Sequence, residues 1–256
     1  FVKVDALASL LRPDTTLVSI MAVNNEIGSI QPIHDIAALI EDRPTVSFHV
    51  DAVQALAKVA TEVYLPERVD FATFSSHKFH GLRGVGFVYI KEGKKITPLL
   101  TGGGQEKEMR STTENVAGIA ATAKALRLAM ENQEAFASKT QQMKEVIRKE
   151  LANYPDVTIF SGEDHFAPHI LTFGIKGVRG EVVVHAFEEF DIYISTTSAC
   201  SSKAGKPAGT LIAMGVDKNI AQTAVRLSLD FENDMSQVEQ FLTKFKLIYE
   251  QTRKVR

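Results

Sequence analysis

Three short apolar runs in the first part of the chain are each followed at once by a polar motif. The runs are TLVSIMAV (16–23), TVSFHV (45–50) and VDFATF (69–74), and a fourth run, VGFVYI, spans residues 85–90. Their length and β-branched content are typical of buried strands. The segment PIHDIAALI (32–40) has the spacing of a short helix. Strands that alternate with helices predict an α/β fold with a mostly parallel sheet, in which ligands bind outside the carboxyl ends of the strands.

The composition is that of an ordinary globular protein, with 45% apolar residues, 23% charged residues and a net charge of −2. This charge offers no bulk attraction to nucleic acid or to an anionic membrane, and no apolar run is long enough to span a bilayer. The first residues lack the features of a signal or transit peptide. The single cysteine, Cys200, cannot form an internal disulfide or a cysteine-rich zinc site. We therefore expect a cytoplasmic protein without a metal site, a membrane span or direct contact with nucleic acid.

The second half of the chain has a different pattern. Residues 115–153 are predicted to be helical with a bend near residues 131–138, and several short strands and helices follow, ending in an amphipathic helix over residues 235–254. We place a domain boundary near residue 133. The prediction is a large domain over residues 1–133 and a small α+β domain over residues 134–256, in which Cys200 lies in a loop between a strand and a helix.

The motif HVDAVQ (49–54) begins within the end of the second run, and SSHK (75–78) comes directly after the third. Asp51 and Gln54, three apart at an expected helix start, would point the same way. Lys78 can form an imine with an aldehyde, and the neighbouring hydroxyl and imidazole can donate to a phosphate. Each motif also has an ordinary alternative, such as a helix cap for Asp51 or a turn for VNNEIG (23–28). Together they supply the carboxylate, the amine and the phosphate donors that pyridoxal phosphate (PLP) requires.

The order of these motifs resembles that of the group I, NifS/IscS-like cysteine desulfurases, which belong to the class V aminotransferases among the PLP enzymes of fold type I. The resemblance runs through VNNEIG, HVDAVQ, SSHKFHG, GGGQEKEMRSTTEN, SACSSK and VRLSL. It implies a PLP-binding large domain, incomplete at the N-terminus, and a small domain with the catalytic cysteine. Relative to that family, we expect an N-terminal segment to be absent, including the histidine that stacks on the cofactor ring.

The resemblance also implies roles around the cofactor. Lys78 would hold PLP covalently and later carry a proton. Asp51 would pair with the pyridine nitrogen, and Gln54 would hydrogen-bond the ring hydroxyl. Ser75 and His77 would hold the phosphate.

Four further residues receive roles by the same resemblance. Thr113 would reach the phosphate from the partner subunit of a homodimer. Asn25, which also contacts the cofactor, and Arg226 would bind the substrate carboxylate, although an ordinary structural ion pair is an alternative for the arginine. Cys200 would accept sulfur as a persulfide.

The implied activity is conversion of L-cysteine to L-alanine, with sulfur passed to an acceptor protein for iron–sulfur cluster assembly or tRNA thiolation. Two alternatives remain open at this point. One is another class V enzyme, an aminotransferase or a selenocysteine lyase. The other is a non-catalytic fragment that only binds sulfur acceptors.

Overall fold

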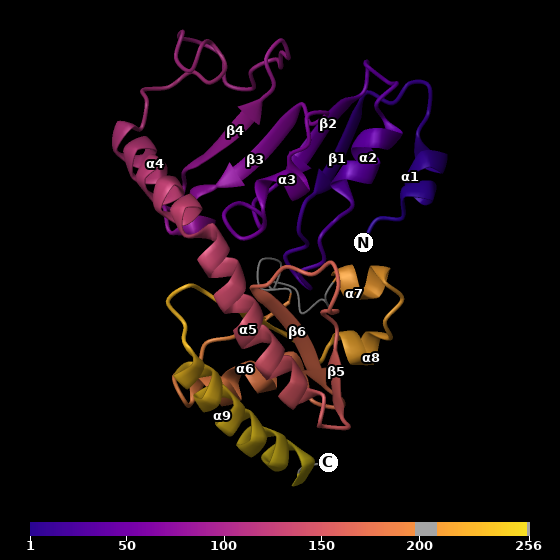
Figure 1. Ribbon diagram of the computed structural model, residues 1–256, viewed down its shortest axis with the longest axis vertical. Coiled ribbons are helices and arrows are strands. Elements are labelled where there is room, and N and C mark those ends of the chain that lie inside the picture. The colour runs from indigo at the N-terminus through magenta and orange to yellow at the C-terminus, as the bar shows by residue number, and fades with distance from the viewer. Residues whose placement is uncertain (198–208, 255–256) are drawn as a thin grey trace. The chain divides into compact units, whose positions relative to one another are not determined.

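The computed structural model describes residues 1–197 and 209–254 (Figure 1). The chain divides into two compact units, which we describe separately. Unit 1 comprises Phe1–Ala22 and Gln31–Gln133, and unit 2 comprises Val23–Ile30 and Glu134–Arg256. Residues 23–30, which the sequence-based boundary had left in the first part, therefore group with the second unit. Cys200 lies outside the described residues.

Unit 1 is built on a four-stranded sheet with the order β1-β2-β3-β4. The first three strands are parallel, and β4 runs antiparallel to β3. The prediction of an α/β fold with a mostly parallel sheet is thus confirmed. The strands are β1 (Leu17–Met21), β2 (Ser47–Asp51), β3 (Phe71–Ser75) and β4 (Gly86–Ile90), and the helices are α1 (Val4–Leu10), α2 (Ile33–Leu39), α3 (Thr61–Tyr64), the 3-10 helix η1 (Ser76–Phe79) and α4 (Val116–Glu131).

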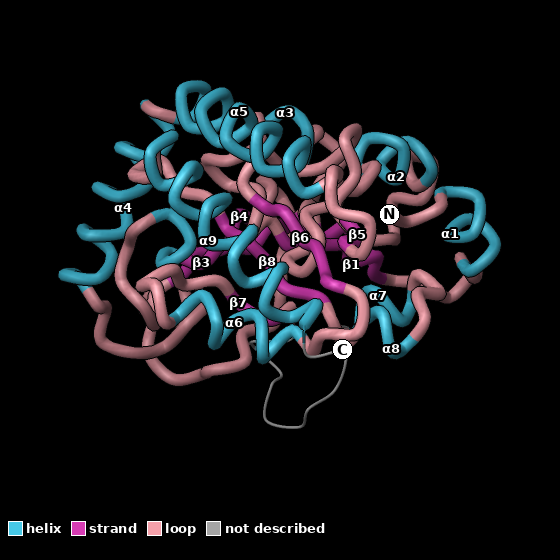
Figure 2. Tube along the Cα trace, turned by 90° about the horizontal axis from the view of Figure 1, so that it is seen from below, coloured by secondary structure: helices cyan, strands magenta, loops and turns pink. Residues whose placement is uncertain are grey.

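The two faces of this sheet differ in exposure. Side chains alternate between the faces along each strand, and one set is buried, including Phe48 and Val50 of β2. Figures 1 and 2 show α2 and α3 on one side of the sheet. The opposite set, apart from the buried Phe71 of β3, is partly or fully exposed, and we call it the open face. Its members include Leu17, Ser19, Met21, His49, Asp51, Thr73, Ser75 and Val88.

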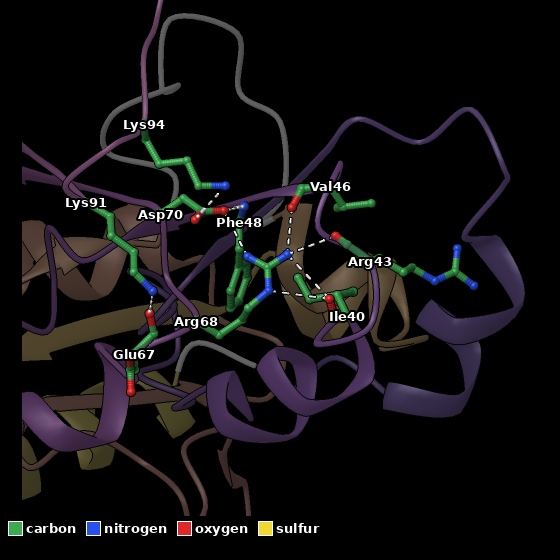
Figure 3. Close-up of polar contacts among 9 residues, drawn as sticks. All are labelled: Ile40, Arg43, Val46, Phe48, Glu67, Arg68, Asp70, Lys91 and Lys94. Atoms are coloured by element: carbon green, nitrogen blue, oxygen red, sulfur yellow. Dashed lines mark hydrogen bonds and ion pairs between the residues drawn. The ribbon is translucent and has the colours of Figure 1, made fainter.

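A buried charge cluster holds the amino-terminal ends of the central strands (Figure 3). Asp70, directly before β3, accepts hydrogen bonds from the backbone N–H of Phe48 at 2.9 Å and from Arg68 at 2.9 Å, and its other oxygen lies 3.0 Å from the Lys94 ammonium. The Arg68 guanidinium also donates to backbone carbonyls, the shortest bond being 2.7 Å to Val46. Burial acts to raise the pKa of Asp70, but the hydrogen bonds and the two cations outweigh it and lower the pKa.

Unit 2 contains a second four-stranded sheet with the order β5-β6-β8-β7, in which every pair is antiparallel. Its helices precede, connect and follow the strands. In chain order the elements are α5 (Gln133–Leu151), β5 (Val157–Ile159), β6 (Ile170–Ile175), α6 (Gly180–Glu188), β7 (Ser195–Thr196), α7 (Gly209–Ala213), α8 (Lys218–Ala221), β8 (Ala224–Ser228) and α9 (Met235–Lys254).

The interior strand β6 is buried along its whole length, and its side chains pack on both faces of the sheet. Leu171, Phe173 and Ile175 join the main apolar core with side chains of α5, α6 and α9. The alternate residues face residues 23–30, because the Thr172 hydroxyl donates to the Glu26 carbonyl at 2.6 Å. One strand thus supports the hydrophobic core on one side and a functional loop on the other.

Most predicted elements match the structure, and the differences concern short elements. The helical stretch does break within residues 131–138, since α4 ends at Glu131 and α5 begins at Gln133. Among the short strands expected after residue 153, the run DIYIS (191–195) pairs with β8 only at its end, where β7 covers Ser195–Thr196. The short helices α1, α3 and α8 and the 3-10 helix η1 were not predicted. In the described part of the chain, none of the helices combines the length and the apolar composition that crossing a membrane requires.

The charge cluster predicts a specific loss of stability. Asp70→Asn should lower the free energy of unfolding by about 3 to 5 kcal/mol at pH 7, because two cations lose their buried anion. The deficit should shrink as the pH falls through the lowered pKa of Asp70, where the parent carboxylate is itself protonated. Urea unfolding across this pH range measures both effects. Asp14→Asn is the matched control, because Asp14 pairs with Arg12 at an exposed site and should cost less than about 1 kcal/mol.

Unit 2 carries an ammonium group in its interior. Lys144 is 1% exposed and donates to the carbonyl of Ala167 at 2.8 Å. Burial lowers its pKa to about 8, with a smaller opposing effect of Glu145. Because the unfolded chain holds this proton more tightly, folding stability should rise by about 3 kcal/mol between pH 8 and pH 10.5.

Lys144→Met should remove this rise, and urea unfolding at pH 7, 9 and 10 measures it. Lys149→Met, at an exposed position of the same helix, is the control and should retain the rise. An unchanged pH dependence in Lys144→Met would contradict the assignment.

Candidate active site

The carboxyl ends of β2 and β3 bring three predicted cofactor residues, Asp51, Ser75 and Lys78, to one edge of the unit 1 sheet. Asp51 is the last residue of β2, and it pairs in register with Thr73 of β3. β3 continues to Ser75, and the chain then turns directly into η1, which contains Lys78. Because the two strands are parallel, their carboxyl ends meet at the same edge, where open α/β sheets bind ligands.

The other predicted residues of unit 1 lie on the connections. His77 is exposed within η1, Gln54 is half-buried after β2, and Thr113 is exposed in the loop before α4. The helix expected to start at Asp51 is wrong: residues 53–58 form consecutive turns, and the left-handed φ of 60° at Ala57 keeps them from continuing as a helix.

The turn that carries Lys78 is held from several sides. Ser76 is fully buried, and its hydroxyl lies 2.9 Å from that of Thr122 on α4. The ammonium of Lys58 donates to the carbonyl of Lys78 at 2.7 Å. Sequence reasoning missed Lys58, because nothing in its local sequence distinguishes it from a solvated lysine. These contacts fix the backbone of Lys78 and leave its side chain to another task.

Asp51 and Lys78, the charged groups at this edge, form no ion pair within the described part of the chain. Within the part that the structure describes, Asp51 forms no ion pair and its carboxylate accepts only the backbone N–H of Val53, at 3.0 Å. The Lys78 ammonium likewise has no ion pair or hydrogen bond among the described residues. A carboxylate, an amine, a hydroxyl and an imidazole at one sheet edge match the groups that PLP needs. The residues present therefore fit this cofactor.

In unit 2 the structure joins the two residues predicted to bind the substrate carboxylate. Arg226 lies on β8 between Val225 and Leu227, which point into the core. Alternation along the strand turns the guanidinium to the other face, where it donates to the carbonyl of Asn25 at 2.8 Å. Asn25 therefore orients Arg226 through its backbone.

Residues 23–30 form a tight turn, as the alternative interpretation of VNNEIG expected. The Asn24 side-chain oxygen accepts from the backbone N–H groups of Glu26 and Ile27 at 2.9 and 3.0 Å. Gly28 has a φ of 81°, and a Cβ there would lie 2.9 Å from Ile170. No local feature around Glu26 indicates that its carboxylate accepts the N–H of Thr210, 3.1 Å away at the start of α7.

Metal binding finds no support in the described residues, where no three His, Cys, Asp or Glu side chains form a cluster that could hold an ion. The predicted sulfur-carrying residue, Cys200, is outside those residues, so its role stays a prediction. The structure thus brings Asp51, Ser75 and Lys78 to one edge of the unit 1 sheet, and in unit 2 it joins Arg226 to Asn25.

A family model described as Aminotransferase class-V matches residues 1–241. The chain belongs to the class V aminotransferase family. The prediction of family and of fold type I is confirmed, since a solved structure described as a NifS-like protein matches 98% of the chain with a TM-score of 0.87 and 37% identity.

Curated relatives within this family carry related names. A "NifS/IcsS protein homolog" from Lactobacillus delbrueckii subsp. bulgaricus is 50% identical over 255 residues, which is 99% of this chain and 66% of the relative. A "Cysteine desulfurase IscS" from Clostridium botulinum is 36% identical over 258 residues, which is 100% of this chain and 64% of the relative. The chain covers 65% of the NifS-like structure. It therefore spans slightly less than two thirds of the length of these relatives.

The turn that carries Lys78 requires glycine at position 81, because the backbone there lies close to the side chain of Ser76. A Cβ at this position would lie 1.8 Å from the buried Ser76 hydroxyl, so Gly81→Ala should displace Ser76 and cost about 1 to 3 kcal/mol of stability. Gly104→Ala is the control, because a Cβ there meets nothing within 4 Å. Thermal unfolding compares the two variants, and equal midpoints would show that the turn tolerates a side chain.

Proposed function

We propose that this chain acts as a PLP-dependent cysteine desulfurase that converts L-cysteine to L-alanine and retains the sulfur on Cys200 as a persulfide. The main observation behind the proposal is that Asp51 and Lys78 lie at one edge of the unit 1 sheet without ion-pair partners among the described residues. The curated relatives support the choice of reaction, since several are named cysteine desulfurases. The expected location in the cytoplasm stays a prediction.

When bound, PLP supplies an electron-withdrawing ring that stabilises the negative charge formed on the substrate. In this proposal the Lys78 amine holds the cofactor through its aldehyde carbon, and its Nζ later carries a proton. The Asp51 carboxylate keeps the ring nitrogen protonated, and the Gln54 amide bonds the ring hydroxyl. Ser75 and His77 donate to the phosphate.

The substrate side of the proposal rests on Arg226 and Asn25. The guanidinium offers a planar pair of donors that suits a carboxylate. Its bond to the Asn25 carbonyl fixes one N–H direction and so orients the remaining donors. Asn25 would add its side-chain amide to the same carboxylate.

Sulfur transfer requires a thiolate, which we assign to Cys200. The thiolate attacks the sulfur of L-cysteine, an S–S bond forms, and the Cβ–S bond of the substrate breaks. The carbon that loses sulfur keeps the electron pair and takes up one proton, which balances the proton lost from the substrate thiol. Alanine leaves, and the persulfide remains on the protein.

Two partners complete the proposal. A second copy of the chain would contribute Thr113 to the phosphate site, which suits the exposed position of this residue. The persulfide would pass to a sulfur-acceptor protein that serves iron–sulfur cluster assembly or tRNA thiolation.

The test adds PLP and L-cysteine to the 256-residue chain and follows three signals: the visible band of the lysine-bound cofactor, alanine, and the mass of the Cys200 peptide. We expect Cys200→Ala to keep the band and lose alanine formation by more than about 100-fold, because the nucleophile is gone. Lys78→Ala should lose both. Lys95→Ala, at an exposed lysine of the same unit, is the control and should resemble the parent.

Three results would contradict the proposal. Alanine formation by Cys200→Ala at the parental rate would remove the persulfide step. A preference for L-selenocysteine that survives this substitution would indicate a selenocysteine lyase, and formation of a 2-oxo acid would indicate an aminotransferase. A folded chain that binds no PLP would favour a non-catalytic role.

A further inference from the structure

A hydrogen-bonded row of side chains crosses three strands on the open face. The Ser19 hydroxyl of β1 lies 2.7 Å from Nδ1 of His49 on β2. Nε2 of the same ring lies 3.1 Å from the Thr73 hydroxyl of β3. Both ring nitrogens of His49 are therefore engaged by neutral hydroxyl groups.

This row lies directly beside Asp51. His49 and Asp51 are two residues apart on β2 and so share the open face. Thr73 of β3 is a neighbour of both residues: it pairs in register with Asp51, and its hydroxyl forms a hydrogen bond with His49. The imidazole is thus the nearest titratable neighbour of the carboxylate along its own strand.

The hydroxyl partners favour an uncharged imidazole. A neutral ring donates through one nitrogen and accepts through the other, and two hydroxyls satisfy both roles. Burial lowers the pKa of His49, while the charge of Asp51 acts weakly in the opposite direction. In the described part of the chain, the groups bonded to the ring from β1 and β3 are these two hydroxyls, and neither is charged.

We propose that His49 is a positioning residue for Asp51: the row formed by Ser19, His49 and Thr73 holds an uncharged ring beside the carboxylate, so that no histidinium competes for it at this position. This inference rests on the proposed function, in which Asp51 pairs with the ring nitrogen of PLP. A histidinium at this place would instead form an ion pair with Asp51 and weaken its hold on the cofactor. The role is electrostatic and depends on a hydrogen-bond geometry that spans three strands.

Two substitutions of His49 distinguish the effect of a positive charge on PLP binding from the effect of a changed side-chain shape. His49→Lys adds a permanent cation beside Asp51 and should weaken PLP binding at pH 7.5 at least about tenfold. His49→Gln keeps a neutral side chain with a donor and an acceptor, and should weaken binding no more than about threefold. The control is His34→Lys, because His34 is exposed on α2 and bonds the carbonyl of Glu62. Titration of the cofactor absorbance measures all three dissociation constants.

A second readout needs no cofactor. Titration of the Asp51 carboxyl by ¹³C NMR in the PLP-free chain should show a pKa lower in His49→Lys than in the parent, by about 1 unit or more, and little changed in His49→Gln. The parent His49 ring should titrate below 6.5, the ordinary value for histidine.

The outcomes decide the inference and the proposed function separately. An Asp51 pKa that is the same in His49→Lys and in the parent would overturn the inference, as would equal PLP affinity of His49→Lys and His34→Lys. If every variant fails to bind PLP, the proposed function is contradicted, and the Asp51 titration alone decides whether His49 acts on this carboxylate.

Discussion

The alternation of side chains along each strand is the constraint on which both units depend. In unit 2, β8 points Val225 and Leu227 into the apolar core and Arg226 to the opposite face, where it meets Asn25. In unit 1, β2 buries Phe48 and Val50 and presents His49 and Asp51 on the open face. A shift of one residue in either strand would bury a charge and expose the core, so packing of the apolar side chains also fixes the polar ones.

Two aspartates in the unit 1 sheet show how position decides the use of a carboxylate. Asp70, at the amino-terminal edge, is buried and bonded to Arg68 and Lys94. Asp51, at the carboxyl-terminal edge, is exposed and has no ion pair within the described residues. Stability requires the first charge to be neutralised inside the chain. The second is left for a ligand, which is the pattern expected of a binding site on a parallel sheet.

The loop at residues 23–30 makes several hydrogen bonds within unit 2. Its backbone carbonyls accept bonds from Arg226 and Thr172, and the side chain of Glu26 accepts from Thr210. One turn therefore orients the proposed substrate-binding arginine and also fixes the start of α7. Its tight geometry explains the glycine at position 28, where the backbone is left-handed and Ile170 is close.

The sequence by itself determined the local features of this protein. Runs such as TVSFHV and VDFATF specified the strands, because burial of β-branched and aromatic side chains needs only short-range patterning. The motifs after them were sufficient to indicate the family, the fold type and the residues of the expected cofactor site. The resemblance carried the roles of Arg226 and Cys200, since no local pattern distinguishes a substrate-binding arginine from a structural one.

Contacts between distant residues were decided only by the tertiary structure. The bond from Lys58 to Lys78 and the row through His49 join segments that lie 20 to 30 residues apart. The grouping of residues 23–30 with unit 2 depends on partners more than 130 residues away, such as Ser161. Local sequence patterns cannot predict such pairs. Strand register and the packing of β6 and β8 bring them within hydrogen-bonding distance only after the chain has folded.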